Sequence, residues 1–320
     1  MIDFVGKRYL FFLISALFIL PGVISMILPG GLHPGIDFTS GSILTITFPE
    51  AVDTGQLRSA MADIGHPEAI VQRSEDVYLV RTFPLHEAQR DSEGNVTQPS
   101  ERDQIQQALD QRFPGARIVG LELVSPLVAA EIVQKSILAV LAACVGILAY
   151  LSFAFRKVKS PWRYGACAVA ALVHDALLVL GVFSILGRIF GIELDALFIT
   201  AVLTVIGFSV HDTIVVFDRI RENLPRYAGE RFETVVNHSL TQTLGRSLST
   251  SITTLLVLVA LLLFGGVTIR TFVLALVIGI VSGTYSSIFN ASMLLVIWEN
   301  GELARVLGRR PAPEAAGAVA

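Results

Sequence analysis

Six long apolar runs constrain the fold of this chain more than any other feature. Each is close to the roughly 20 residues that a helix needs to cross the hydrocarbon core of a bilayer. They occupy residues 9–28, 135–155, 164–187, 195–217, 248–265 and 271–298. The charge content agrees, because only 16% of the residues are charged, against about 25% in soluble domains. The sequence therefore predicts a polytopic α-helical membrane protein with six transmembrane helices.

The chain changes character between the first and second runs. Strand-like alternation and helix-like spacing follow one another there in the order β-α-β-β-α-β. The segments are residues 42–48, 54–65, 69–83 (two strands around a turn), 102–113 and 116–124. This order predicts a ferredoxin-like α/β domain, with the polar residues 86–101 as a mobile surface loop. The domain has no nucleotide-binding glycine loop and no nucleophile elbow, so we expect it to bind or move rather than catalyse.

The same patterns predict the domain organisation and the orientation in the membrane. We expect an N-terminal segment with the first transmembrane helix (1–29), the α/β domain (30–134), a five-helix membrane region (135–298) and a C-terminal tail (299–320). Residues 230–246 have the spacing of an amphipathic helix on the cytoplasmic face. Lysine and arginine concentrate in the N-terminal segment, in the loops after the second and fourth runs and in the tail. The positive-inside rule then predicts cytoplasmic termini and an extracytoplasmic α/β domain.

The fourth run contains a carboxylate, Asp212, although a charge at membrane depth costs about 2.5–3.5 kcal/mol on insertion scales. Ser209 and Thr213 share its helical face, and small or hydroxyl-bearing residues recur in the fifth and sixth runs. Such residues allow close helix packing. We therefore expect the fourth, fifth and sixth spans to surround a polar interior in which Asp212 meets Arg246.

Two roles are open for each of these two charged residues. Asp212 is either a proton-binding carboxylate in a relay or a salt-bridge or hydrogen-bond partner that holds the bundle together. Arg246 either takes part in that relay or extends to the lipid headgroups at the end of its span. Asp175, in the third run, serves helix packing or the proton path, and packing is the favoured interpretation.

Other classes of function find little support in the sequence. The dipeptide His-Asp occurs at residues 174–175 and 211–212, but no second ligand set with metal spacing accompanies either pair. The flanking residues typical of intramembrane aspartyl proteases are missing. Cys144 and Cys167 lie in apolar runs and suggest neither a disulfide nor a zinc site. We predict no enzymatic activity, no catalytic residues, no metal or cofactor, and no nucleic-acid binding.

Several stretches together resemble the SecF family of protein-export membrane subunits. They are GIDFTSGS (35–42), ALVHDALLVLG (171–181), VIGFSVHDTIVVFDRIREN (205–223), SLTQTLGRSLSTSITTLLVLVALLLFGG (239–266) and GTYSSIF (283–289). The resemblance extends over the chain to about residue 300, in the order and topology typical of the family.

This resemblance implies half of a transporter of the RND superfamily, located in a prokaryotic plasma membrane. The other half is a SecD-like subunit, and the resulting SecDF complex uses the proton gradient, rather than a cofactor, to promote protein translocation. The implied partners are the SecYEG channel, the translocating polypeptide, a YidC-type insertase and membrane lipid. Asp212 and Arg246 fall on family positions implicated in proton movement, and the SecD half supplies a further carboxylate.

The chain departs from the family pattern at two positions. His211 stands where asparagine is common, and Ser40 stands where the first motif usually has a glycine. Histidine titrates near neutrality, so His211 either tunes proton uptake or packs against a neighbouring helix, and packing is slightly favoured. Two alternative functions also remain: a stand-alone RND-type exporter of a lipid or small molecule, and a non-transporting scaffold of the translocon.

Overall fold

The computed structural model describes residues 3–74, 77–86, 88–90 and 96–302. Residues 87 and 91–95 of the predicted mobile loop and the tail from residue 303 lie outside the described residues. The chain divides into two compact units, which are described separately. The membrane unit consists of Met1–His33 and Leu138–Ala320, and the α/β unit consists of Pro34–Ile137.

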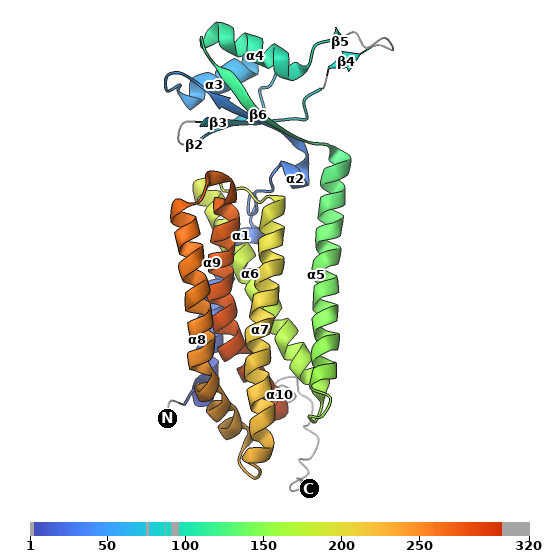
Figure 1. The fold of residues 1–320 in the computed structure, drawn as a ribbon, viewed down its shortest axis with the longest axis vertical. Coiled ribbons are helices and arrows are strands. Elements are labelled where there is room, and N and C mark those ends of the chain that lie inside the picture. The colour runs from blue at the N-terminus through green and yellow to red at the C-terminus, as the bar shows by residue number, and fades with distance from the viewer. Residues whose placement is uncertain (1–2, 75–76, 87, 91–95, 303–320) are drawn as a thin grey trace. The chain divides into compact units, whose positions relative to one another are not determined.

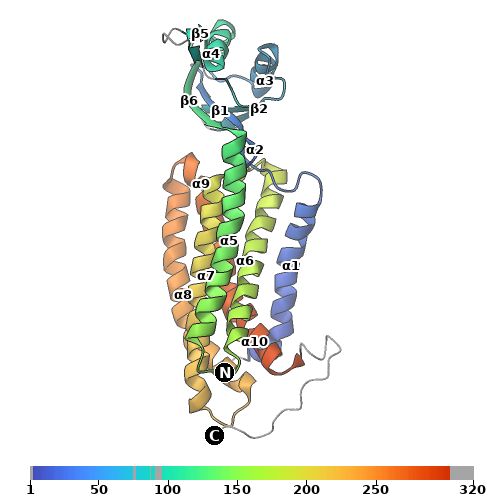
Figure 2. The same cartoon turned by 90° about the vertical axis from the view of Figure 1, so that its right-hand side faces the viewer.

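Six helical segments of the described chain are long and apolar enough to cross a membrane, which confirms the predicted polytopic helical fold. The first consists of η1 (Val5–Lys7) and α1 (Arg8–Ile27), and the last consists of α9 (Val267–Tyr285), η2 (Ser286–Ala291) and α10 (Ser292–Glu299). Between them come α5 (Pro126–Ala154), α6 (Pro161–Phe190), α7 (Ala196–Arg226) and α8 (Phe232–Phe264). Figure 1 and Figure 2 show α7, α8 and α9 side by side.

The amphipathic segment predicted before the fifth span is continuous with that span. Both belong to α8, a single helix of 33 residues. Its first turns bury Val235, Val236 and Leu240. Val236 and Leu240 belong to one hydrophobic cluster with Phe217 and Ile220 of α7. No proline interrupts the helix, so the amphipathic part runs directly into the membrane span.

Small residues bring the helices of the membrane unit into close contact. A Cβ atom added to Gly22 of α1 would lie 2.6 Å from the Cα atom of Gly181 in α6. On α9, a Cβ atom at Gly283 would lie 3.0 Å from the Cβ atom of Ser209 in α7, and one at Gly279 would collide with Val205. Gly279 and Gly283 form a G-x-x-x-G pair of the kind that packs membrane helices. The close packing of α7 against α9 therefore depends on the absence of side chains at Gly279 and Gly283.

The α/β unit has the predicted ferredoxin-like order. Its main elements are β1 (Gly41–Thr47), α3 (Thr54–Asp63), β2 (Ile70–Ser74), β3 (Val77–Thr82), α4 (Glu101–Arg112) and β6 (Arg117–Val124). The four strands form an antiparallel sheet in the order β2-β3-β1-β6. Leu44 and Val80 of the sheet pack with Leu57 of α3 and with Ile105 and Leu109 of α4 in one buried core. A short helix, α2 (Ile36–Thr39), precedes the first strand.

The segment predicted as a loop between β3 and α4 contains some regular structure. Two short strands, β4 (Gln89–Arg90) and β5 (Val96–Gln98), pair antiparallel in a separate two-stranded sheet. Polar composition alone did not reveal them, because β4 and β5 are too short to show an alternating pattern.

Ser40 stands at a backbone position that suits glycine. Its φ of 63° and ψ of 163° lie in a region that is essentially restricted to glycine and costs other residues about 1–3 kcal/mol. We therefore expect Ser40→Gly to stabilise the start of β1 by about 1 kcal/mol, after allowing for the greater freedom of glycine in the unfolded chain. Slower hydrogen–deuterium exchange of the β1 and β3 amides in the Ser40→Gly variant would show this stabilisation.

Ser42→Gly is the matched control for that substitution. Ser42 is buried, and its Oγ atom accepts a hydrogen bond from the Leu85 amide at 2.9 Å. The same chemical change two residues later should therefore accelerate exchange in the same strands. Equal effects of the two variants would contradict the assignment of strain to Ser40.

Candidate functional site

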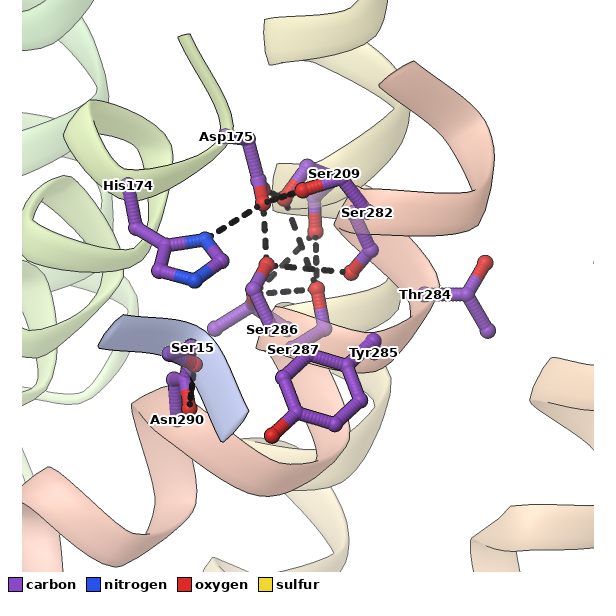
Figure 3. A network of polar contacts seen from close by, with 12 residues as sticks. Ser15, His174, Asp175, Ser209, Ser282, Thr284, Tyr285, Ser286, Ser287 and Asn290 are labelled. Atoms are coloured by element: carbon purple, nitrogen blue, oxygen red, sulfur yellow. Dashed lines mark hydrogen bonds and ion pairs between the residues drawn. The ribbon is translucent and has the colours of Figure 1, made fainter. Parts of the chain in front are cut away.

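Among the described residues of the membrane unit, the most highly connected carboxylate belongs to Asp175 on α6. Its side chain is 0% exposed. The Oγ atoms of Ser209, Ser282 and Ser286 each donate a hydrogen bond to it at 2.7 Å, and His174 Nδ1 lies 3.0 Å from its Oδ1 atom. Figure 3 shows these side chains converging from α6, α7 and the last span. Asp175 therefore joins three transmembrane segments through one buried group, which we call the Asp175 network.

The Asp175 network continues along the seam between α7 and η2. Thr213 Oγ1 donates to Ser287 Oγ at 2.9 Å, and Ser287 Oγ donates to the carbonyl oxygen of Ser209 at 2.9 Å. Ser286 and Ser287 lie on the π-helical turn η2 (Ser286–Ala291). A π-helical turn is rare and often marks a functional site. Here it places two consecutive serines where both reach the neighbouring helices.

Asp212 of α7 has a very different environment. Its side chain is 2% exposed, yet its Oδ2 atom has no hydrogen-bond partner among the described residues. Ser247 Oγ of α8 is also buried and has no hydrogen-bond partner among the residues that the structure describes. Ser251 of α8 is a hydrogen-bonding neighbour of the Asp212 carboxylate and also bonds Thr284 of α9 at 2.6 Å. Leaving a buried polar atom unpaired costs about 1–3 kcal/mol, and more when it is charged. A proton on Asp212, or a cation from outside this chain, would relieve this cost.

Arg246 does not meet Asp212, contrary to the arrangement expected from the sequence. No ion pair joins the two within the described residues, and the Arg246 side chain is exposed. The physical reason is the helical phase of α8. Ser247 and Ser251 turn inward at 1% and 3% exposure, and the side chain of the preceding residue projects about 100° away. Arg246 therefore faces outward from the membrane unit.

His211 also faces outward. Its side chain is 64% exposed, and its Nδ1 atom lies 3.9 Å from Asp212 Oδ1. It does not pack into the interior, which disfavours the interpretation of His211 as a packing residue. The imidazole of His211 therefore lies beside buried Asp212 at the outer surface of α7.

The sequence singled out Ser209, Thr213 and Asp175 without revealing how they combine. Thr213 and Ser209 join the Asp175 network rather than contact Asp212 directly. The sequence also pointed to the spans of α7, α8 and α9 as the polar interior, but the central acceptor comes from α6. The sequence did contain one signal for this acceptor, namely the carboxylate of the His174–Asp175 pair within an apolar run.

The described residues contain no group of three or more histidine, cysteine, aspartate or glutamate side chains that could hold a metal ion. The two polar centres are instead made of hydroxyl groups and carboxylates, which suit hydrogen bonding and proton binding.

Comparison with known proteins decides the family. A family model described as "Protein export membrane protein SecD/SecF, C-terminal" matches residues 104–301, more than half of the chain. The protein translocase subunit SecF of Thermobaculum terrenum is 52% identical over 318 residues, which cover 99% of both chains. The chain belongs to the SecF family. A second SecF, from Anaerolinea thermophila, is 40% identical over 94% of this chain and 96% of its own.

Solved structures of SecDF contain a region with the same fold as this SecF-family chain. The crystal structure of SecDF from Thermus thermophilus, described as a translocon-associated membrane protein, matches 93% of this chain at 32% identity and a TM-score of 0.79. A SecDF structure in a super-membrane-facing form matches 96% at 30% identity and a TM-score of 0.64. This chain spans 39% and 40% of those two SecDF chains. This SecF-family chain therefore corresponds to less than half of each of those SecDF chains.

Proposed function

We propose that this SecF-family chain pairs with a SecD-like subunit and uses the proton gradient to promote protein translocation. The observation that carries the proposal is Asp212, a carboxylate buried in a membrane helix with an unpartnered oxygen. An intramembrane carboxylate of this kind is expensive to maintain and typical of proton relays. Arg246 is the second relay residue of the proposal, and the source of energy is the gradient rather than a bound cofactor.

The outward-facing polar residues of α8 support a protein partner. Arg246, Ser249 and Thr253 are exposed and follow one another at three- and four-residue spacing, so they lie on one face of the helix. The hydroxyl groups of Ser249 and Thr253 bond back to carbonyl groups of their own helix. A charged and hydroxyl-rich face is unfavourable against lipid tails. A second subunit with polar groups at this depth would cover it.

The proposed mechanism couples protonation of Asp212 to helix packing. One charge that crosses the membrane potential provides about 2.3 kcal/mol per 100 mV, which is enough to shift a two-state equilibrium of a few kcal/mol. Asp212 lies between Ser209 and Val216, on the helix whose seam with α9 depends on Gly279 and Gly283. A change in its charge acts on a tightly packed seam, and such seams respond by discrete repacking. No covalent chemistry is involved, so the chain acts without enzymatic activity of its own.

The proposed orientation rests on the distribution of basic residues. We infer cytoplasmic termini and an extracytoplasmic α/β unit in a prokaryotic plasma membrane. On the outer side, that unit would contact the polypeptide emerging from a SecYEG-type channel, with a YidC-type insertase nearby. An impermeant maleimide added to intact cells should label a cysteine introduced at exposed Ser59 of α3, and labelling only after lysis would contradict this orientation.

A photo-crosslinker at Thr253 tests the pairing directly. In native membranes, we expect it to capture a SecD-like protein, because Thr253 lies on the exposed polar face of α8. The matched control is Leu17, which is 67% exposed on the apolar helix α1 and should give no such product. Capture of a second copy of this chain at Thr253 would instead support a stand-alone exporter and contradict the proposed pairing.

A further inference from the structure

A basic groove lies at the end of the membrane unit where α5 runs into α6. It has a volume of about 680 Å³ and is formed by the last turn of α5, the connecting turn and the last turns of α7. Its lining includes the four cations Arg156, Lys157, Lys159 and Arg221 and, among the described residues, no carboxylate. The volume falls in the range typical of sites for small ligands. Nothing in the proposed proton-driven function uses this groove.

The cations of this basic groove are held by a defined turn. The amide of Arg156 bonds the carbonyl oxygen of Phe153 at 3.2 Å, and the amide of Val158 bonds that of Phe155 at 2.9 Å. The Arg156 guanidinium also lies 4.5 Å from the centre of the Phe153 ring. The turn ends at Ser160, which has a φ of 58°, followed by Pro161 at the first position of α6. Several cationic side chains are therefore presented from a compact, internally hydrogen-bonded turn.

Arg221 fixes the opposite wall of the groove. One of its terminal nitrogens lies 2.6 Å from Asp218 Oδ1, and the other donates to the carbonyl oxygen of Ala154 at 3.4 Å. A guanidinium has five N–H donors, so donors remain for a ligand after these contacts. Arg221 thus connects α7 to the end of α5 and keeps N–H donors for a ligand in the groove, while Asp218 balances its charge.

The residues around the groove are those typical of the membrane–water interface. Its basic residues begin directly after the apolar residues of α5. Trp162, two residues beyond the turn, is 52% exposed and contacts Trp298 of α10 edge to face at 4.9 Å. Tryptophan is enriched at this level of membrane proteins because its ring is both apolar and polar. The lining also includes Phe153, Val158 and Leu224, so the site is amphipathic.

We propose that this groove binds the phosphodiester headgroup of an anionic phospholipid. Lysine and arginine are the natural partners of a phosphate, and basic pockets between membrane helices suit anionic headgroups. The apolar lining would contact the glycerol and the first carbons of the acyl chains. The charge, the amphipathic lining and the interfacial residue types all select this ligand over a soluble anion.

Native mass spectrometry of the full chain in detergent micelles tests the proposal, with phosphatidylglycerol as the probe and phosphatidylcholine of the same acyl chains for comparison. We expect selective retention of phosphatidylglycerol. Lys157→Gln together with Lys159→Gln should weaken its binding about 30-fold, since each lysine near an anionic surface contributes about a factor of five. The charge-conserving pair Lys157→Arg and Lys159→Arg should retain binding, which separates the loss of charge from misfolding.

The matched control removes two exposed cations away from the groove, by Lys7→Gln together with Arg270→Gln. It should bind phosphatidylglycerol as the unmodified chain does. Equal loss in this control would overturn the proposal, because it would indicate a response to overall charge. Equal retention of phosphatidylcholine, or displacement of phosphatidylglycerol by millimolar inorganic phosphate, would overturn it as well.

Discussion

Replacing Asp212 by asparagine is expected to abolish the stimulation of protein export by the proton gradient, a loss of at least tenfold in the gradient-dependent component. The amide has nearly the same shape as the carboxylic acid but cannot exchange a proton at this site. The measurement is the export of a secretory precursor into inverted membrane vesicles, with and without a protonophore. The vesicles come from cells that lack their own SecD and SecF and express this chain together with its SecD-like partner. Only the difference between the two conditions reports on the relay.

The structure predicts that this substitution leaves the fold intact. Asp212 Oδ2 makes no hydrogen bond within the described residues, so the exchange breaks no contact of that atom. A neutral amide in this position also avoids the burial of an unpaired charge. The thermal stability of the purified chain should therefore stay the same or rise.

Glu230→Gln is the matched control, because it makes the same chemical change at an exposed position between α7 and α8. It should leave gradient-dependent export unchanged. Full gradient-dependent export by Asp212→Asn would refute the relay. If that variant instead failed to assemble with its partner while the remaining complexes kept their response to the gradient, the scaffold function would be correct.

The features that could be predicted from the sequence are those determined by local periodicity. Six apolar runs are sufficient to place the spans, and the alternation in the α/β unit is sufficient to give its β-α-β-β-α-β order. Asp212 was identified for the same reason, because a carboxylate in an apolar run stands out without any knowledge of its neighbours.

The Asp175 network could not be predicted in this way. The serines that bond Asp175 are separated from it by 34, 107 and 111 residues in the chain. Their convergence depends on the packing of α6 against α7 and the last span, and on the π-helical turn that rotates Ser286 and Ser287 toward the seam. Tertiary contacts of this kind leave no periodic signal in a single sequence.

The outward direction of Arg246 has a simpler cause and could have been predicted from the sequence. Consecutive helical residues project about 100° apart. Ser247, Ser251 and Leu258 form the buried side of α8 at four- and seven-residue spacing, which excludes Arg246 from that side. The expected polar interior between the fourth, fifth and sixth spans favoured a pair with Asp212, whereas the helical phase directs Arg246 outward.

Replacing Asp175 by alanine should destabilise the membrane unit by about 3 kcal/mol. Three serine hydroxyls lose their acceptor in a buried site, and each unpaired group costs about 1–3 kcal/mol. The sum is reduced because hydroxyls can turn back to carbonyl groups of their own helix, as Ser286 already does toward Gly283 at 3.2 Å. The expected decrease in the apparent melting temperature in detergent is about 6–12 °C for a unit of this size.

Combining Asp175→Ala with Ser282→Ala and Ser286→Ala tests the cause of this loss. Removing the unpaired hydroxyls should restore part of the stability, because taking away both partners of a hydrogen bond is less harmful than taking away one. Asp218→Ala, which breaks an exposed ion pair with Arg221, is the control and should cost less than about 1 kcal/mol. A triple variant no more stable than Asp175→Ala would show that the lost volume, rather than the unpaired serines, destabilises the helices. An unchanged melting temperature for Asp175→Ala itself would show that the network contributes nothing to holding the three segments together.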